Sequence, residues 1–136
     1  MTIDPYRLAS EMKSRFPDVL FAYLFGSAQS GTLRAGGDVD IAVWISDITR
    51  RMEMIPELIG LVESFAGGAP CDLIFLNDAG DLLSFEALQG TILFIREEAR
   101  DHHAWFYSRT CREYEDKLAF MNKQLNYRGY EVQWDH

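Results

Sequence analysis

The chain is poor in cysteine and in long apolar runs, and each shortage argues against a class of protein. Its two cysteines, Cys71 and Cys111, belong to no CxxC motif or Cys/His cluster, which argues against a disulfide framework and a structural zinc site. No apolar run approaches the roughly 18 residues that a membrane-spanning helix needs. The N-terminal segment lacks the basic flank and apolar stretch of a signal peptide. We therefore expect a cytoplasmic protein that does not associate with membranes.

Basic residues are also scarce. The sequence has 13 Lys and Arg against 21 Asp and Glu, a net charge of -8. General electrostatic attraction to nucleic acid is therefore not expected, and no direct nucleic-acid partner is predicted. An anionic substrate such as a nucleotide would need local compensation of its charge, which a bound divalent metal ion supplies.

The overall composition is that of one folded domain. Hydrophobic residues make up 48% and charged residues 25% of the 136 residues, values typical of a globular domain. No internal repeat, low-complexity tract or linker interrupts the chain. We predict a single domain over residues 1–136, with a core at about 19–96 and a C-terminal helix at about 97–128.

Hydrophobic spacing predicts alternating helices and strands. Asp4 is the expected N-cap of the first helix, with Pro5 at its first position, and Pro56 interrupts the second helix. Asn77 or Asp78 is expected to cap the third. Helices are predicted at residues 4–16, 47–65 and 81–89, and strands at 19–25, 38–45, 71–76 and 91–95. This pattern is typical of an α/β (α+β) fold in which a small mixed sheet is flanked by helices.

The last forty residues predict one long helix with an apolar seam. Trp105, Phe106 and Phe120 lie outside this seam, and His102-His103 is expected on a solvated surface. Two interpretations of the helix remain open: packing on the domain's own sheet, or binding of a partner. The seam recurs at three- and four-residue steps through Ala104, Tyr107, Cys111, Tyr114, Leu118, Met121 and Leu125.

Two carboxylates stand at the start of the second predicted strand. Asp38 and Asp40 are two positions apart, so strand geometry places them on one face of the sheet. Like charges this close repel each other, and a cation between them relieves the repulsion. A third carboxylate, Asp72, lies near the start of another strand, and Gly26-Ser27 ends the first strand.

The joint pattern is more specific than its parts. Gly26-Ser27, a ten-residue spacer, Asp38-x-Asp40 and a later Asp72 resemble the nucleotidyltransferase superfamily related to DNA polymerase beta. Within it, the stretches LFGSAQSGTLRAGGDVDIAV and CDLIFLNDAGDLLSFEALQGTILF look most like the minimal nucleotidyltransferase antitoxins of the MntA type. The resemblance covers about residues 19–96 and implies the nucleotidyltransferase fold.

The resemblance gives each motif residue a chemical role. Asp38, Asp40 and Asp72 would be the catalytic residues and would bind two Mg²⁺ ions. These ions would contact the attacking and leaving oxygens. Asp72 would also orient the nucleophile or accept its proton. Gly26 and Ser27 would bind the phosphates of ATP, and Arg34 is the basic residue that can reach the same region.

Partner and reaction are implied by the family alone. The resemblance implies an antitoxin that transfers AMP from ATP to a tyrosine of a cognate HEPN-domain RNase toxin and inactivates it, in a hetero-oligomeric complex. One alternative is a non-catalytic antitoxin that acts by tight binding to the HEPN partner. Another is a nucleotidyltransferase for small molecules of the aminoglycoside type, although this class usually appends a substrate-binding domain.

Overall fold

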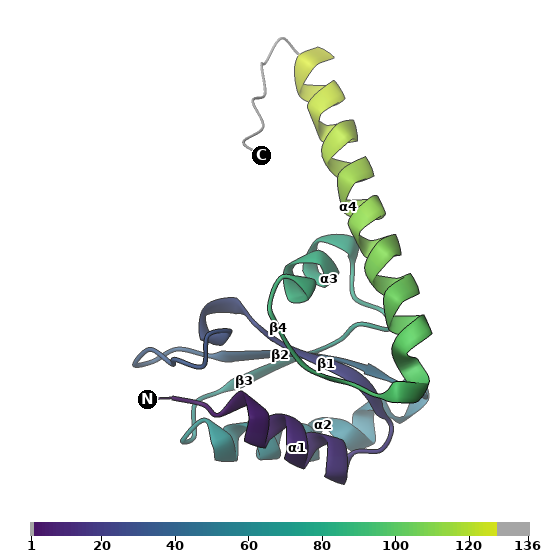
Figure 1. The fold of residues 1–136 in the computed structure, drawn as a ribbon. Coiled ribbons are helices and arrows are strands. Elements are labelled where there is room, and N and C mark those ends of the chain that lie inside the picture. Colours follow the sequence, from purple (N-terminus) through teal and green to yellow (C-terminus); the bar gives the residue numbers. More distant parts are fainter. Residues whose placement is uncertain (1, 128–136) are drawn as a thin grey trace.

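A four-stranded sheet forms the centre of the molecule. The computed structural model describes residues 2–127 (Figure 1), and the strands lie side by side in the order β3-β2-β1-β4. β1 runs antiparallel to β2 and β4, whereas β2 and β3 are parallel. The bounds are β1 Val19–Phe25, β2 Val39–Ile45, β3 Cys71–Phe75 and β4 Thr91–Ile95. The prediction of a small mixed sheet flanked by helices is confirmed.

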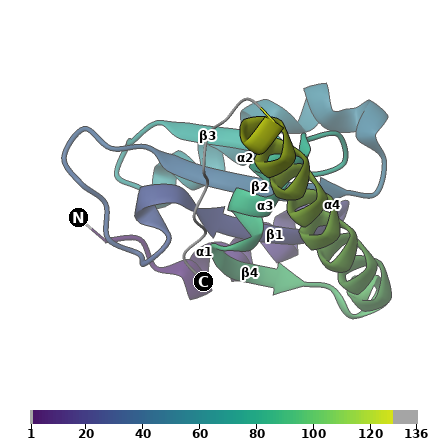
Figure 2. The ribbon, with the colours of Figure 1, turned by 90° about the horizontal axis from the view of Figure 1, so that it is seen from above.

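Helices cover both faces of this sheet. In Figure 1, α1 and α2 lie below the sheet, whereas α3 and α4 lie above it, and Figure 2 shows α4 crossing over the sheet from above. The helix bounds are α1 Pro5–Arg15, α2 Arg51–Phe65, α3 Asp81–Leu88 and α4 Arg100–Tyr127. Three short 3-10 turns complete the order: η1 Gly26–Ala28, η2 Ile48–Arg50 and η3 Glu97–Ala99. None of the helices in the described part of the chain is long and apolar enough to be a membrane span.

The alternation of side chains along β2 divides the core into two clusters. Val39, Ile41 and Val43 are fully buried with residues of α1 and α2, whereas Ala42 belongs to a second cluster with residues of α3 and α4. Successive residues of a strand point to opposite faces, so the even-numbered positions of β2 face α3 and α4. β1 supplies buried residues to both clusters, as its uninterrupted apolar run predicts.

The ends of the first two helices follow local chemistry. The carboxylate of Asp4 accepts hydrogen bonds from the backbone N–H groups of Tyr6 and Arg7, so the predicted N-cap of α1 is confirmed. The predicted helix 47–65 is divided into η2 and α2. The division does not fall at Pro56, which lies inside a continuous α2. Pro56 is the sixth residue of α2 and lacks the N–H that would donate to the carbonyl of Met52, yet the helix continues through it.

The predicted cap of α3 is wrong. Asn77 instead bridges to β2, where its side-chain amide accepts from the backbone N–H of Ile45 and donates to the carbonyl of the same residue. Asp78 forms an ion pair with Arg51. α3 therefore begins after Gly80, which provides no side-chain hydrogen bond.

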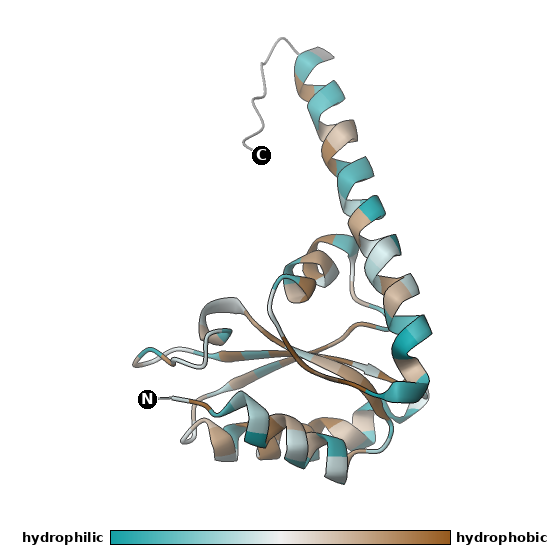
Figure 3. Cartoon of the chain, viewed as in Figure 1, coloured by the Kyte–Doolittle hydropathy of each residue, from teal (hydrophilic) through white to brown (hydrophobic). Residues whose placement is uncertain are grey.

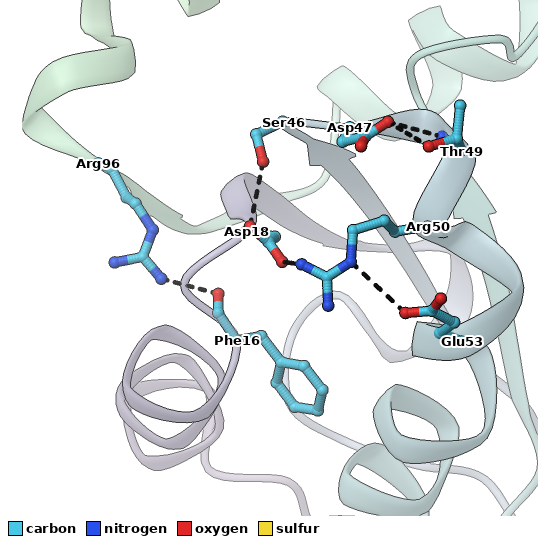
Figure 4. A network of polar contacts seen from close by, with 8 residues as sticks. All are labelled: Phe16, Asp18, Ser46, Asp47, Thr49, Arg50, Glu53 and Arg96. Carbon is cyan, nitrogen blue, oxygen red and sulfur yellow. Dashed lines mark hydrogen bonds and ion pairs between the residues drawn. The ribbon is translucent and has the colours of Figure 1, made fainter.

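Arg96 joins three elements at the end of β4. Its guanidinium donates to the carbonyls of Lys13, Phe16 and Val19 at 2.7–2.9 Å, which ties β4 to the end of α1 and the start of β1. Figure 4 shows its contact with Phe16 beside a surface network in which Asp18 contacts Ser46 and Arg50. The arginine thus pairs with the carbonyl of Lys13 in the last turn of α1 and adds a second donor to that of Phe16, which also accepts from the backbone N–H of Val19.

α4 packs on the sheet through its first half only. Phe106 and Thr110 are buried, whereas Tyr107 is 46% exposed, so the predicted seam does not form the sheet-facing side in this half. The seam residues Cys111 and Tyr114 are half-buried, beside the buried side of α4. Phe106, expected outside the seam, is buried. Figure 1 shows the second half of α4 rising clear of the domain, and Figure 3 shows apolar residues along it.

The expectation for the His102-His103 pair holds for only one of them. His102 is exposed, whereas His103 is half-buried and shares a hydrogen bond with the hydroxyl of Tyr23 on β1. Burial raises the pKa of Tyr23, with smaller contributions from Tyr107 and Cys111. Burial also lowers the pKa of His103, with His102 adding to the effect, so both groups are held neutral at the base of α4.

Candidate active site

The fold brings the three predicted aspartates to one end of the sheet. Asp40 on β2 lies directly opposite Asp72 on the parallel strand β3, in the register Asp40↔Asp72. Asp38 precedes the first residue of β2. Because Asp40 is an even-numbered position of β2, its carboxylate projects from the face covered by α3 and α4. Residues 32 positions apart in sequence therefore form one carboxylate group.

Electrostatic repulsion marks this cluster. Burial raises the pKa of Asp40, and the carboxylates of Asp72, Asp38 and Glu86 raise it further, in that order. A hydrogen bond to the carboxyl of Asp72 adds to the same effect. Asp40 is half-buried, whereas Asp38 and Asp72 are exposed. The partial burial of Asp40 and the negative charges around it therefore favour a bound proton or a bound cation at this carboxylate.

Gly26 lies against the same carboxylate. β1 ends at Phe25, which is paired with Asp40, and the chain then turns through η1. Gly26 has a φ of +73°, and a Cβ atom built on it would collide with Oδ2 of Asp40. Ser27 follows at an exposed position. The turn thus brings the main chain of Gly26 against Asp40, in a conformation that favours glycine.

The chemistry of these side chains fits Mg²⁺. Within residues 2–127, no three His, Cys, Asp or Glu side chains are arranged as a finished metal site. Mg²⁺ is bound by oxygen ligands, often one or two carboxylates together with substrate phosphates and water. Asp38, Asp40 and Asp72 supply such oxygens, and the repulsion at Asp40 is of the kind that a cation relieves.

Glu86 is a carboxylate near the site that the sequence motifs do not include. It lies on α3 and contributes to the raised pKa of Asp40, so α3 carries an acidic group toward the aspartate face. The available signal was an acidic residue within an otherwise apolar stretch, Phe85 to Leu88. This sequence feature does not predict where Glu86 lies in space, because its position depends on how α3 packs on the sheet.

A hollow of about 370 Å³ lies between the loops that precede β2 and β3. Residues 33–37 and 66–70 line it, and Arg34 is its only basic residue. Neither the aspartates nor Gly26-Ser27 belong to its lining. Arg34, which the sequence offered as a phosphate contact, therefore lines a neighbouring hollow and not the aspartate cluster itself.

The described chain resembles solved toxin–antitoxin structures in fold. A chain of a toxin–antitoxin complex with AMP-PNP matches with a TM-score of 0.66 and 23% identity, over 91% of this chain and 97% of that one. A chain of the complex between tri-AMPylated Shewanella oneidensis HEPN toxin and MNT antitoxin matches with a TM-score of 0.60 and 21% identity, over 90% and 97%. A chain of the MntA-HepT complex gives a TM-score of 0.59 at 21% identity, over 90% and 93%. These similarities establish the shared fold.

Sequence comparison assigns the family. Among curated proteins nothing matches the chain. The family model described as "Polymerase beta, Nucleotidyltransferase" matches residues 8–99, which include the Gly-Ser turn and all three aspartates. Since this match covers more than half of the sequence, the chain belongs to the polymerase beta nucleotidyltransferase family.

Proposed function

We propose that this chain is an antitoxin that transfers AMP from ATP to a tyrosine of a cognate HEPN-domain RNase toxin. The observation that carries the proposal is the pairing of Asp40 and Asp72 in register beside Gly26. Family membership supports nucleotidyl transfer. The choice of a protein acceptor is supported by the fold shared with an antitoxin bound to an AMPylated HEPN toxin. An ATP-dependent reaction of this kind is expected in the cytoplasm.

The reaction exchanges the phosphoanhydride bond between the α- and β-phosphates of ATP for a phosphodiester bond to tyrosine. The tyrosine oxygen forms a bond to the α-phosphorus of ATP, the bond between that phosphorus and the oxygen bridging to the β-phosphate breaks, and pyrophosphate leaves. The tyrosine proton passes to a general base, and Asp72 is our candidate because it is exposed at the edge of the cluster. The product carries AMP on the tyrosine, a bulky anionic group.

The remaining residues hold the nucleotide. In our proposal, Asp38, Asp40 and Asp72 would bind two Mg²⁺ ions. When bound, these ions would neutralise charge on the phosphate oxygens. Gly26 allows the main chain to approach the phosphates closely, and Ser27 offers hydroxyl and backbone donors to them. Arg34 compensates phosphate charge from the adjoining hollow.

A labelling experiment tests this function. The chain is incubated with Mg²⁺, its cognate HEPN-domain protein, and ATP labelled at either the α- or the γ-phosphate. We expect label on the HEPN protein from α-labelled ATP only, and none when its acceptor tyrosine is replaced by phenylalanine. Labelling from the γ-phosphate would indicate a kinase, and no labelling by the intact chain would overturn the proposal.

The same materials separate the two alternatives. An antitoxin that acts by binding alone would protect cells even as the double variant Asp38→Asn with Asp40→Asn, whereas a catalytic antitoxin loses protection. The variant Glu57→Gln is the matched control, because Glu57 is an exposed carboxylate on α2, on the opposite face of the sheet. A panel of aminoglycosides in place of the HEPN protein tests transfer to small molecules.

A further inference from the structure

α4 is much longer than the helix that packs against it. It has 28 residues and α3 has eight, which correspond to lengths of about 42 Å and about 12 Å. The two helices meet where the rings of Phe85 and Tyr114 stack with their centroids 3.7 Å apart. Phe85 lies in the eight-residue helix α3, whereas α4 continues for about three turns beyond Tyr114.

Apolar residues nevertheless continue on the same side of α4. Leu118, Met121 and Leu125, here called the distal seam, follow Tyr114 at steps of four, three and four residues. Residues at these steps lie above one another on one side of a helix, so the distal seam extends the side that faces α3. Met121 is 47% exposed, and the two leucines are half-buried. Within residues 2–127, the distal seam thus continues the side of α4 that contacts α3, beyond the contact between Phe85 and Tyr114.

The seam also lies on the side of α4 that looks toward the site. α3 carries Glu86, which acts on Asp40, and α3 and α4 cover the sheet face from which Asp40 projects. In Figure 1, α3 lies beside the middle of α4, on the same side of the sheet. A partner that binds the distal seam would therefore lie next to α3, which covers the sheet face that carries Asp40.

The area of the distal seam identifies what kind of contact it makes. Three side chains bury at most a few hundred Å², whereas a stable interface buries about 800 Å² on each partner. A pair of copies held by this seam alone would be weak. The seam suits a partner that is already engaged elsewhere on the same face, and the three-four spacing is the one that accepts a helix.

Resting on the proposed function, we propose that the distal seam binds an amphipathic α-helix of the HEPN-domain protein that accepts AMP. The shared fold supports this assignment. The family model ends at residue 99, yet the match to the toxin–antitoxin structure covers 91% of the chain, so the match extends into α4. The aspartates and the seam would then hold one partner at two places, which raises its effective concentration at the nucleotide.

The test compares two double variants of equal charge. Leu118→Glu with Met121→Glu places charges on the seam. Ala119→Glu with Asn126→Glu places them at exposed positions on the outward side of the same half of α4. Binding of the HEPN-domain protein is measured by titration calorimetry, with labelling from α-labelled ATP measured in parallel. We expect the seam variant to weaken binding at least about tenfold and to raise KM while kcat at saturation is kept, and the control to match the intact chain.

The possible outcomes separate docking from chemistry. Equal binding by the seam and control variants would overturn the docking proposal, even if the intact chain labels the HEPN protein. Binding that depends on the seam without any labelling would support docking and overturn only the proposed transfer. A dimer of the chain alone in sedimentation equilibrium that the seam variant dissociates, with unchanged HEPN binding, would assign the seam to a second copy and overturn the proposal. Unchanged circular dichroism and Tm confirm that both variants fold.

Discussion

The backbone of Gly26 lies directly against the carboxylate of Asp40. A Cβ atom at residue 26 would occupy the place of Oδ2 of Asp40, so the glycine is required by two conditions at once. Its φ of +73° is a conformation that L side chains rarely adopt, and its neighbour leaves no room. The separate effects of the two conditions can be measured, because Gly36 has nearly the same φ in open surroundings.

We predict that Gly26→Ala lowers kcat/KM for AMP transfer at least about 100-fold. The added methyl group would displace the carboxylate of Asp40 from the position that the reaction needs. Gly36→Ala is the control, with a φ of +74° and no atom within 4 Å of the place that a Cβ atom would take. Both variants should lose about 1 kcal/mol of stability from backbone strain. Labelling assays and thermal melts measure the two effects, and similar losses of activity in both variants would contradict the prediction.

We predict that Asp40→Asn abolishes transfer while raising Tm by about 2 °C or more, because it removes a charge repelled by Asp72, Asp38 and Glu86. Glu57→Gln removes an exposed charge on α2 and should leave both quantities nearly unchanged. Differential scanning calorimetry without Mg²⁺ and a labelling assay with Mg²⁺ measure the effects. A lowered Tm for Asp40→Asn would show that the carboxylate stabilises the fold, contrary to this prediction.

Stability should depend on pH through His103. Its pKa is lowered in the folded chain, so the unfolded chain binds a proton first as the pH falls below the ordinary value of about 6.5. The free energy of unfolding therefore decreases with falling pH in this window and is fully retained above it. Chemical denaturation at pH 7.5 and pH 5.5 should show a smaller loss for His103→Gln than for the control His102→Gln. Identical pH dependence in the two variants would refute the role of His103.

We predict that Arg96→Ala destabilises the fold by about 2–4 kcal/mol, because three carbonyls lose a charged donor. Arg100→Ala is the matched control, since Arg100 is exposed and forms a surface ion pair with Glu97 one turn away, a contact of about 0.5 kcal/mol or less. Urea denaturation measures both. Equal effects would mean that the contacts between β4, α1 and β1 contribute little.

Sequence patterns predicted what depends on neighbouring residues along the chain. The Asp4 cap, the buried run of β1 and the order of helices and strands follow from spacing within one segment. Asp38 lies just before β2, one residue outside the observed strand, so its placement on the same face as Asp40 stays a prediction. The roles of Gly26, Ser27 and the three aspartates stay predictions, which the experiments above test.

Features that depend on tertiary packing escaped prediction. Asn77 bonds to Ile45 and not to α3, because the backbone at the end of β2, 32 residues earlier, competes for its amide. His103 is held by Tyr23, 80 positions earlier. The position of Glu86 and the buried side of α4 were missed for the same reason: both depend on how helices sit on the sheet, which single-helix spacing does not specify.

The strand order has a consequence for how the site is held together. β3 is an edge strand, paired to β2 on one side and to no other strand within the described residues, and it carries Asp72. Edge strands open more easily than central ones because fewer main-chain bonds hold them. A ligand that contacts Asp40 and Asp72 together bridges β2 to β3, and its binding energy adds to the stability of the closed edge. Nucleotide affinity and the local stability of β3 are therefore two measurements of one linked equilibrium.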